Sequence, residues 1–281
     1  MMRSKQMTPA DIDAAHAAGQ RVVEIHRRLA EYLRVGQTLA HIDAFVAKSL
    51  ADLGCESCFF KYRQGRLPPF PSQACLSVNE CIVHGTAGYY EAPMKPGDML
   101  KIDIGVLHRG WIGDAAWTYT FQEFPSEEAK RLAESGKQSL ARGIQELRPG
   151  KTYADWARVV EAAVEKEFGF HLVRGLGGHG YYRRKLHEPP YISNVLPHDL
   201  TQRGTSAEWP DASTPCLPGT VVAVEPMVAI GTSQTFSQPA QWPVFTRDRS
   251  LAVHYEHDVL ITEDGNRLLT DGLDALPDLV G

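Results

Sequence analysis

The segment 98–121 constrains the fold most, because it combines a strong hairpin pattern with two aspartates, residues that strands normally avoid. Asp103 and Asp114 lie on the two apolar arms, and the sequence His-Arg-Gly between the arms is typical of a turn. A two-residue turn at 108–109 places the aspartates directly opposite each other on one face of the hairpin. A left-handed bulge at Gly110 would shift that register.

Two neighbouring carboxylates repel each other, so each needs a raised pKa or a cation nearby. Taken alone, the hairpin is better explained by two acids at a strand edge in water. Three later residues change that interpretation: Glu225 and Glu256 fall inside apolar strand-like segments, and His179 lies among glycines. Carboxylates in apolar strands are costly unless they are paired or bound to a metal. Four such acids with one imidazole therefore indicate a metal site.

The charge of this residue set predicts a pair of metal ions. Four carboxylates carry a charge of −4, which two divalent ions neutralise and one does not. Oxygen-rich ligation with a single imidazole suits Mn²⁺, Co²⁺, Fe²⁺ or Zn²⁺. Two such ions about 3.5–4 Å apart can hold a bridging hydroxide and polarise a carbonyl group.

The order helix, helix, strands occurs twice along the chain, in residues 8–121 and 126–270. Thr8 and Pro9 are typical of a helix start. The order predicts one α+β catalytic domain over residues 1–281, in which two similar halves surround a central site. We expect residues 1–7 to be disordered. The polar, Pro-rich segment 194–216 is expected to be a long surface loop.

Composition argues against several classes of function. The net charge of −5 gives no general attraction to nucleic acid or to an anionic membrane. The sequence has no apolar run of the roughly 20 residues that span a membrane, and its N-terminus lacks the apolar core of a signal peptide. Five cysteines are an odd number in a chain too long to be a disulfide scaffold. We therefore expect reduced thiols and a cytoplasmic location.

Five segments resemble one known family, the type I methionine aminopeptidases, which are metallopeptidases of the pita-bread fold. The segments are SVNECIVHG (77–85), KIDIGVLHRGWIGD (101–114), GHG followed by HE (178–188), PGTVVAVEPMV (218–228) and WPVFTRDRSLAVHYEHDVLITEDG (242–265). The similarity extends from about residue 8 to residue 270.

This resemblance implies a role for each candidate site residue. The implied metal ligands are Asp103, Asp114, His179, Glu225 and Glu256, with Asp114 and Glu256 bridging the two ions. The implied catalytic residues are His84 and His187, which contact the amide and carbonyl groups of the substrate, and Glu225, which accepts a proton from the attacking water. The implied lining of the methionine pocket is Cys75 and Trp242.

The resemblance also implies the reaction. A metal-bound hydroxide would remove the N-terminal methionine from peptides or nascent proteins, while one ion anchors the free amine. The expected partners are therefore N-termini, with no nucleic acid and no membrane, and transient association with a ribosome is left open.

Two alternative functions within the same fold are considered. A proline-directed aminopeptidase generally has an additional N-terminal domain and an Arg two residues before the last ligand Glu, where this chain has His254. A non-catalytic binding relative typically lacks some ligands. The chain also departs from the type I pattern: His254 stands in place of Gln, Asp258 in place of Thr, and the His179–His187 spacing is one residue longer.

Overall fold

The helices and strands follow the predicted order in both halves of the chain. The computed structural model describes residues 7–202 and 204–281. The first half contains α1 (Pro9–Tyr32), α2 (Leu39–Asp52), β1 (Glu56–Ser57), β2 (Cys75–Val78), β3 (Cys81–Val83), β4 (Met99–His108) and β5 (Trp111–Phe121). The second half begins with α3 (Glu127–Ile144), α4 (Tyr153–Glu161) and the π-helical segment η1 (Ala162–Phe168). It continues with β6 (His171–Leu172), β7 (Gly177–Tyr182), β8 (Lys185–Ser193), β9 (Val221–Val224), β10 (Met227–Ala229), β11 (Thr235–Ser237), β12 (Val244–Thr246), β13 (Ala252–His254), β14 (His257–Ile261), β15 (Asn266–Leu268), the 3-10 segment η2 (Leu273–Ala275) and β16 (Leu279–Val280).

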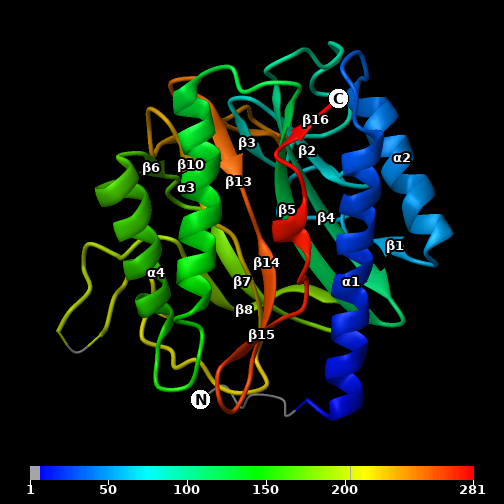
Figure 1. The fold of residues 1–281 in the computed structure, drawn as a ribbon. Helices are drawn as coiled ribbons and strands as arrows, with labels where there is room; N and C mark the ends of the chain where they lie inside the picture. The colour runs from blue at the N-terminus through cyan, green and yellow to red at the C-terminus, as the bar shows by residue number, and fades with distance from the viewer. Residues whose placement is uncertain (1–6, 203) are drawn as a thin grey trace.

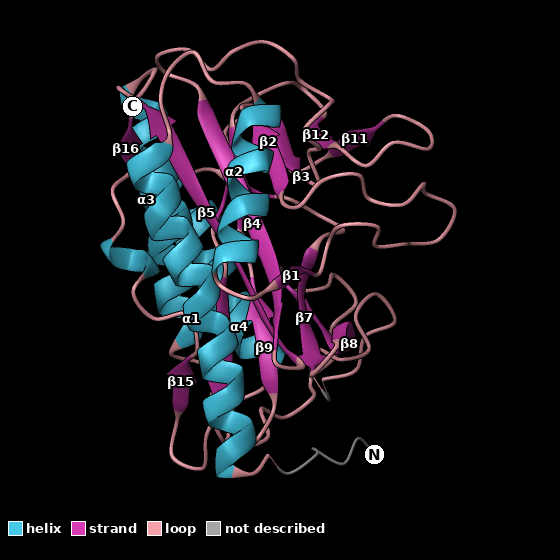
Figure 2. Ribbon diagram, turned by 90° about the vertical axis from the view of Figure 1, so that its right-hand side faces the viewer, coloured by secondary structure: helices cyan, strands magenta, loops and turns pink. Residues whose placement is uncertain are grey.

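Two five-stranded sheets form the centre of the molecule. In the first, β4 pairs with β5, and β1, β2 and β16 complete the sheet; the second has the order β15-β14-β9-β7-β8. Strand β3 of the first half pairs with β12 of the second, and one hydrophobic cluster contains residues from both halves. Figure 1 shows α1 and α2 beside the first sheet and α3 and α4 on the other side of the molecule. Figure 2 shows the helices on one face and the loops near β7, β8, β11 and β12 on the opposite face.

Helix α1 begins at the predicted residue because Thr8 and Asp11 form a capping box. The Thr8 hydroxyl accepts a hydrogen bond from the Asp11 amide (3.2 Å), and the Asp11 carboxylate accepts one from the Thr8 amide (3.1 Å). Pro9 occupies the first helical position, where its missing N–H has no cost. The helix packs on β4 and β5. Its predicted apolar stripe is buried: Val22, Val23, Ile25, Leu29 and Leu33.

The β4–β5 hairpin forms as predicted, but its turn lies one residue later than the two-residue turn considered above. His108 is the last residue of β4 and pairs with Trp111, so the turn consists of Arg109 and Gly110, whose φ angles are 50° and 83°. Positive φ at both positions is typical of a type I′ hairpin. Asp114 therefore pairs with Gly105 and not with Asp103. The register differs by two residues, so both aspartates remain on the same face, as diagonal neighbours.

Glu225 and Glu256 lie between strands, which corrects the expectation that each falls inside one. Strand β9 ends at Val224 and β10 begins at Met227, while β13 ends at His254 and β14 begins at His257. Pro226 cannot donate a backbone hydrogen bond, which favours the first interruption. At the second interruption, the Glu256 amide donates a hydrogen bond to the Ala116 carbonyl of β5, in the first half of the chain (2.9 Å). Both glutamates thus leave their sheets where the two halves meet.

The segment 194–216 has no helix or strand in its described residues, which exclude 203, and part of it is buried. Trp209, Ala212 and Cys216 belong to the main hydrophobic cluster, and the Trp209 indole donates a hydrogen bond to the Tyr191 carbonyl (2.9 Å). Of the segment 1–7, expected to be disordered, residues 1–6 lie outside the described residues and Met7 is buried. Within the described ranges, no helix has both the length and the apolar character needed to cross a membrane.

Candidate metal centre

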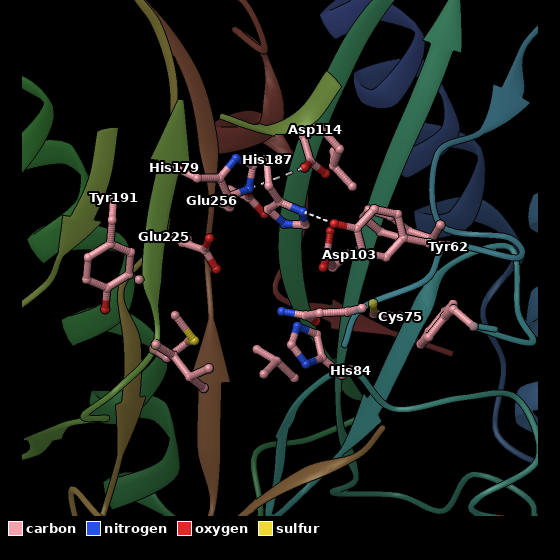
Figure 3. A pocket seen from close by; sticks show the side chains of 18 of the residues that line it. Tyr62, Cys75, His84, Asp103, Asp114, His179, His187, Tyr191, Glu225 and Glu256 are labelled. Atoms are coloured by element: carbon pink, nitrogen blue, oxygen red, sulfur yellow. Dashed lines mark hydrogen bonds and ion pairs between the residues drawn. The ribbon is translucent and has the colours of Figure 1, made fainter. Parts of the chain in front are cut away.

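One cleft, with a volume of about 540 Å³, brings together all nine residues selected from the sequence. They are Cys75, His84, Asp103, Asp114, His179, His187, Glu225, Trp242 and Glu256. Figure 3 shows Asp103 and Asp114 on the strands of the first half, facing His179, Glu225 and Glu256 of the second half. The cleft therefore lies where the two halves face each other.

Glycines on either side of His179 let its strand, β7, press closely against both neighbours. A Cβ atom on Gly178 would lie 2.2 Å from the Ala223 carbonyl oxygen, and one on Gly180 would lie 2.4 Å from the Pro189 carbonyl oxygen. Any side chain at these two positions would force the strands apart. Close packing of β7 therefore explains why glycines flank His179 in the sequence. The same packing holds the His179 imidazole in the cleft.

The acidic side chains and His179 are close enough to share metal ions. Ligand atoms of Asp114, His179 and Glu256 lie within 4.8 Å of one another, and so do those of Glu225, His254 and Glu256. The His179 Nε2 atom is 3.9 Å from Asp114 Oδ2. Glu256 belongs to both groups, which suits a ligand shared between two ions.

Burial raises the pKa of all four carboxyl groups, and neighbouring carboxylates raise it further at three of them. The pKa rises to about 8 at Asp114, where the second cause is Glu225, and to about 8 at Glu225 itself. At Asp103 and Glu256 the pKa is well above its usual range, through burial first and then the charge of Asp114. Burial lowers the pKa of His179 to about 3, which keeps the imidazole neutral and able to bind a metal.

The residues of the cleft fit divalent cations. None of the described residues that line it is Lys or Arg, so no side chain of fixed positive charge offsets the four carboxylates. One oxygen of Asp103 and one of Asp114 are buried without a hydrogen-bond partner. Buried polar atoms normally have a hydrogen-bond partner. Carboxylate oxygens that lack such a partner are suitable ligands for a hard or borderline metal ion.

Two residues near the centre were noted in the sequence as departures from the type I pattern but were given no role. His254 is buried, with its Nε2 atom 3.2 Å from Glu225 Oε2 and 3.9 Å from Glu256 Oε2. Asp258 is also buried, and its carboxylate accepts a hydrogen bond from the Asp114 amide (2.7 Å). Residues 254, 256 and 258 alternate with Tyr255 and His257. In an extended chain this period of two places all three side chains on the same face, so the spacing is a signal that could have linked His254 and Asp258 to Glu256.

We expect the metal-free protein to lose stability as the pH rises from about 5 to 8. Because the pKa values of Asp114 and Glu225 rise from 3.8 and 4.5 to about 8 on folding, the folded state holds protons that the unfolded state has released. The free energy of unfolding therefore falls with pH across that window. Urea unfolding of metal-stripped protein at pH 5.5 and pH 8 measures this, and equal or greater stability at pH 8 would contradict it.

Comparison with known proteins shows similarity to methionine aminopeptidases along nearly the whole chain. The chain is 32% identical over 266 residues to the methionine aminopeptidase of Aquifex aeolicus (strain VF5), covering 93% of this chain and 96% of that protein. The crystal structure of methionine aminopeptidase from Thermotoga maritima matches with a TM-score of 0.83 and 31% identity, over 96% of this chain and 99% of that one. The prolidase from Pyrococcus furiosus shares the fold (TM-score 0.70, 20% identity), but this chain covers 66% of its length.

The fold and the cleft define a metallopeptidase of the pita-bread fold, which confirms the predicted fold class. More specifically, the chain belongs to metallopeptidase family M24, whose sequence profile matches residues 13–263. The enzymes of this family use divalent metal ions, in agreement with the donor set of the cleft.

Proposed function

We propose that this chain is a methionine aminopeptidase, an enzyme that hydrolyses the peptide bond after an N-terminal methionine. The observation that carries the proposal is an apolar pocket directly beside the acidic cluster. Phe59, Phe70, Cys75 and Trp242 are all buried in its wall. Cys75 pairs with Asp103 across β2 and β4, so the pocket and the carboxylates share a wall.

The aromatic residues of this pocket are held in place by one another. The Phe70 and Trp242 rings meet edge to face with centroids 5.2 Å apart, and the Trp242 indole donates a hydrogen bond to the Pro68 carbonyl (2.9 Å). Burial and the nearby carboxylates raise the pKa of Cys75, so its thiol is uncharged. A rigid apolar pocket with sulfur and aromatic faces suits the flexible thioether of methionine. A charged first residue would lose its hydration there without gaining a partner.

The proposed division of roles follows the positions of the side chains. The proposed metal ligands are Asp103, Asp114, His179, Glu225 and Glu256. Two bound ions would share Asp114 and Glu256. When bound, divalent ions would polarise the scissile carbonyl and acidify water. Glu225, which lines the cleft 3.2 Å from His254 Nε2, accepts the proton of the attacking water. His84 and His187 line the same cleft and contact the substrate amide and carbonyl groups.

The two alternatives fit the chain less well. The chain covers nearly all of the methionine aminopeptidases it resembles but 66% of the prolidase, and it has His254 at the position of the expected Arg. A binding relative that had lost catalysis would not be expected to keep five ligand side chains in one cleft. The five cysteines are free, which supports a reducing compartment, and we propose nascent-protein N-termini in the cytoplasm as the substrates.

A small panel of peptides tests the proposed specificity. With Mn²⁺ or Co²⁺ supplied, a Met-Ala peptide should be cleaved, and its N-acetylated form should be inert because it lacks the free amine. An Ala-Pro peptide should be cleaved weakly or not at all. Rates are measured from the release of the free amino acid. Faster cleavage of the Ala-Pro peptide would replace methionine specificity with the proline-directed alternative.

A further inference from the structure

A tyrosine outside the candidate residues contacts one of the cleft histidines. The Tyr62 hydroxyl lies 2.6 Å from the Nδ1 atom of His187, and the two rings meet at 60° with centroids 5.3 Å apart (Figure 3). On another side, the His187 ring packs against the ring of His179, with centroids 4.4 Å apart. His187 therefore lies between a proposed metal ligand and a hydroxyl group. The sequence gives no hint of this pair, whose members are 125 residues apart.

The backbone of Tyr62 is fixed to the wall of the apolar pocket. Its amide donates a hydrogen bond to the Phe59 carbonyl (2.8 Å), and its carbonyl accepts one from the Phe70 amide (2.8 Å). The Phe59 and Phe70 side chains are buried and meet edge to face, with centroids 6.4 Å apart. The backbone that carries the Tyr62 hydroxyl is therefore anchored to the pocket wall by two hydrogen bonds.

We propose that Tyr62 is a positioning residue that holds His187 in the tautomer protonated at Nε2. In the proposed arrangement, the phenol donates its one proton to the unprotonated Nδ1 atom of a neutral imidazole. With Nδ1 used as the acceptor, the single ring proton resides on Nε2. His187 can then donate a hydrogen bond from Nε2 to a substrate carbonyl oxygen in the cleft. This inference rests on the proposed function only for the identity of that oxygen.

The tautomer can be measured directly by ¹⁵N NMR of histidine-labelled protein loaded with diamagnetic Zn²⁺. The His187 signals are assigned by their loss in His187→Gln. In the unsubstituted protein, Nε2 should show the shift of a protonated nitrogen and Nδ1 that of an unprotonated one. In Tyr62→Phe, which keeps the ring, the two shifts should move towards each other as the tautomers exchange. A proton on Nδ1 in the unsubstituted protein, or shifts unchanged by Tyr62→Phe, would overturn the proposal.

Kinetics on a Met-Ala peptide give a second, independent test. Loss of one hydrogen bond should lower kcat by up to about tenfold, with KM and metal content unchanged. Tyr62→Phe should have no further effect in a His187→Ala background, because the tyrosine acts through that imidazole. Tyr32→Phe, which removes a hydroxyl from a ring stacked on Phe45 away from the cleft, is the matched control.

The kinetic outcomes separate this proposal from a role in the pocket or in folding. A raised KM with unchanged kcat would assign Tyr62 to substrate binding and overturn it, as would an equal loss of rate with and without His187. If the unsubstituted protein cleaved no methionine peptide, the proposed function would fail, and the NMR shifts would still decide the tautomer.

Discussion

Replacing Asp114 with Asn is expected to remove two-metal binding and to lower hydrolysis of a Met-Ala peptide by about 10³-fold or more. Asp114 is buried and lies against His179, and one of its oxygens has no hydrogen-bond partner. A neutral amide there would turn either an N–H group or a weaker oxygen donor towards the ions. Because Asp114 is proposed to bridge, both ions should be lost, whereas His179→Ala should mainly weaken one. Elemental analysis of the purified variants measures the metal content.

The same substitution should have the opposite effect on the metal-free protein. It removes one of four mutually repelling carboxylates, so metal-stripped Asp114→Asn should unfold at a higher temperature than the stripped parent at pH 8. Asp13→Asn, at an exposed position on α1, is the control and should change neither metal content nor unfolding. Full two-metal occupancy with normal activity in Asp114→Asn would show that the bridging assignment is wrong.

Replacing His84 or His187 with Ala should lower the rate by about 10²–10⁴-fold while leaving the metal content nearly unchanged. His84 has a φ angle of 58°, which is uncommon for a residue other than glycine and directs its side chain into the cleft beside Trp242. The adjacent Gly85 is pressed against β2, since a Cβ atom there would lie 2.1 Å from the Leu76 carbonyl oxygen. Close packing of the backbone thus stabilises the unusual conformation of His84.

Steady-state rates and elemental analysis together decide the role of these two histidines. His84→Asn, which tolerates positive φ and keeps an N–H donor, should retain more activity than His84→Ala. His198→Ala, at an exposed position in the segment 194–216, should behave like the parent. A loss of metal in parallel with the loss of rate would instead make the histidines ligands.

Local features of the fold could be predicted from the sequence because their causes lie within a few residues. Thr8 and Asp11 determine the start of α1 through bonds between neighbours, and the spacing of apolar residues identifies the buried face of that helix. The hairpin arms also follow from local composition. The convergence of the nine candidate side chains in one cleft could be predicted because the resemblance to the family covers nearly the whole chain.

Other features depend on contacts between distant segments and could not be predicted. The turn lies at Arg109 and Gly110, both with positive φ angles, and local composition does not decide between this register and a turn at 108–109. The interruptions at Glu225 and Glu256 arise where sheets of the two halves meet, which strand propensity does not describe. Asp258 contacts the Asp114 amide across 144 residues, so its role appears only once the halves are packed together.

Metal titration of the stripped enzyme, followed by the release of free methionine from a Met-Ala peptide, tests the central claim most directly. The cluster of four carboxylates and His179 should bind two divalent ions per chain, and methionine release should appear as they bind. The N-acetylated peptide should stay intact under the same conditions. Methionine release that is unaffected by removal of metal, or two bound ions with no cleavage of any free-amine peptide, would contradict the assignment of this cleft as a metal-dependent methionine aminopeptidase site.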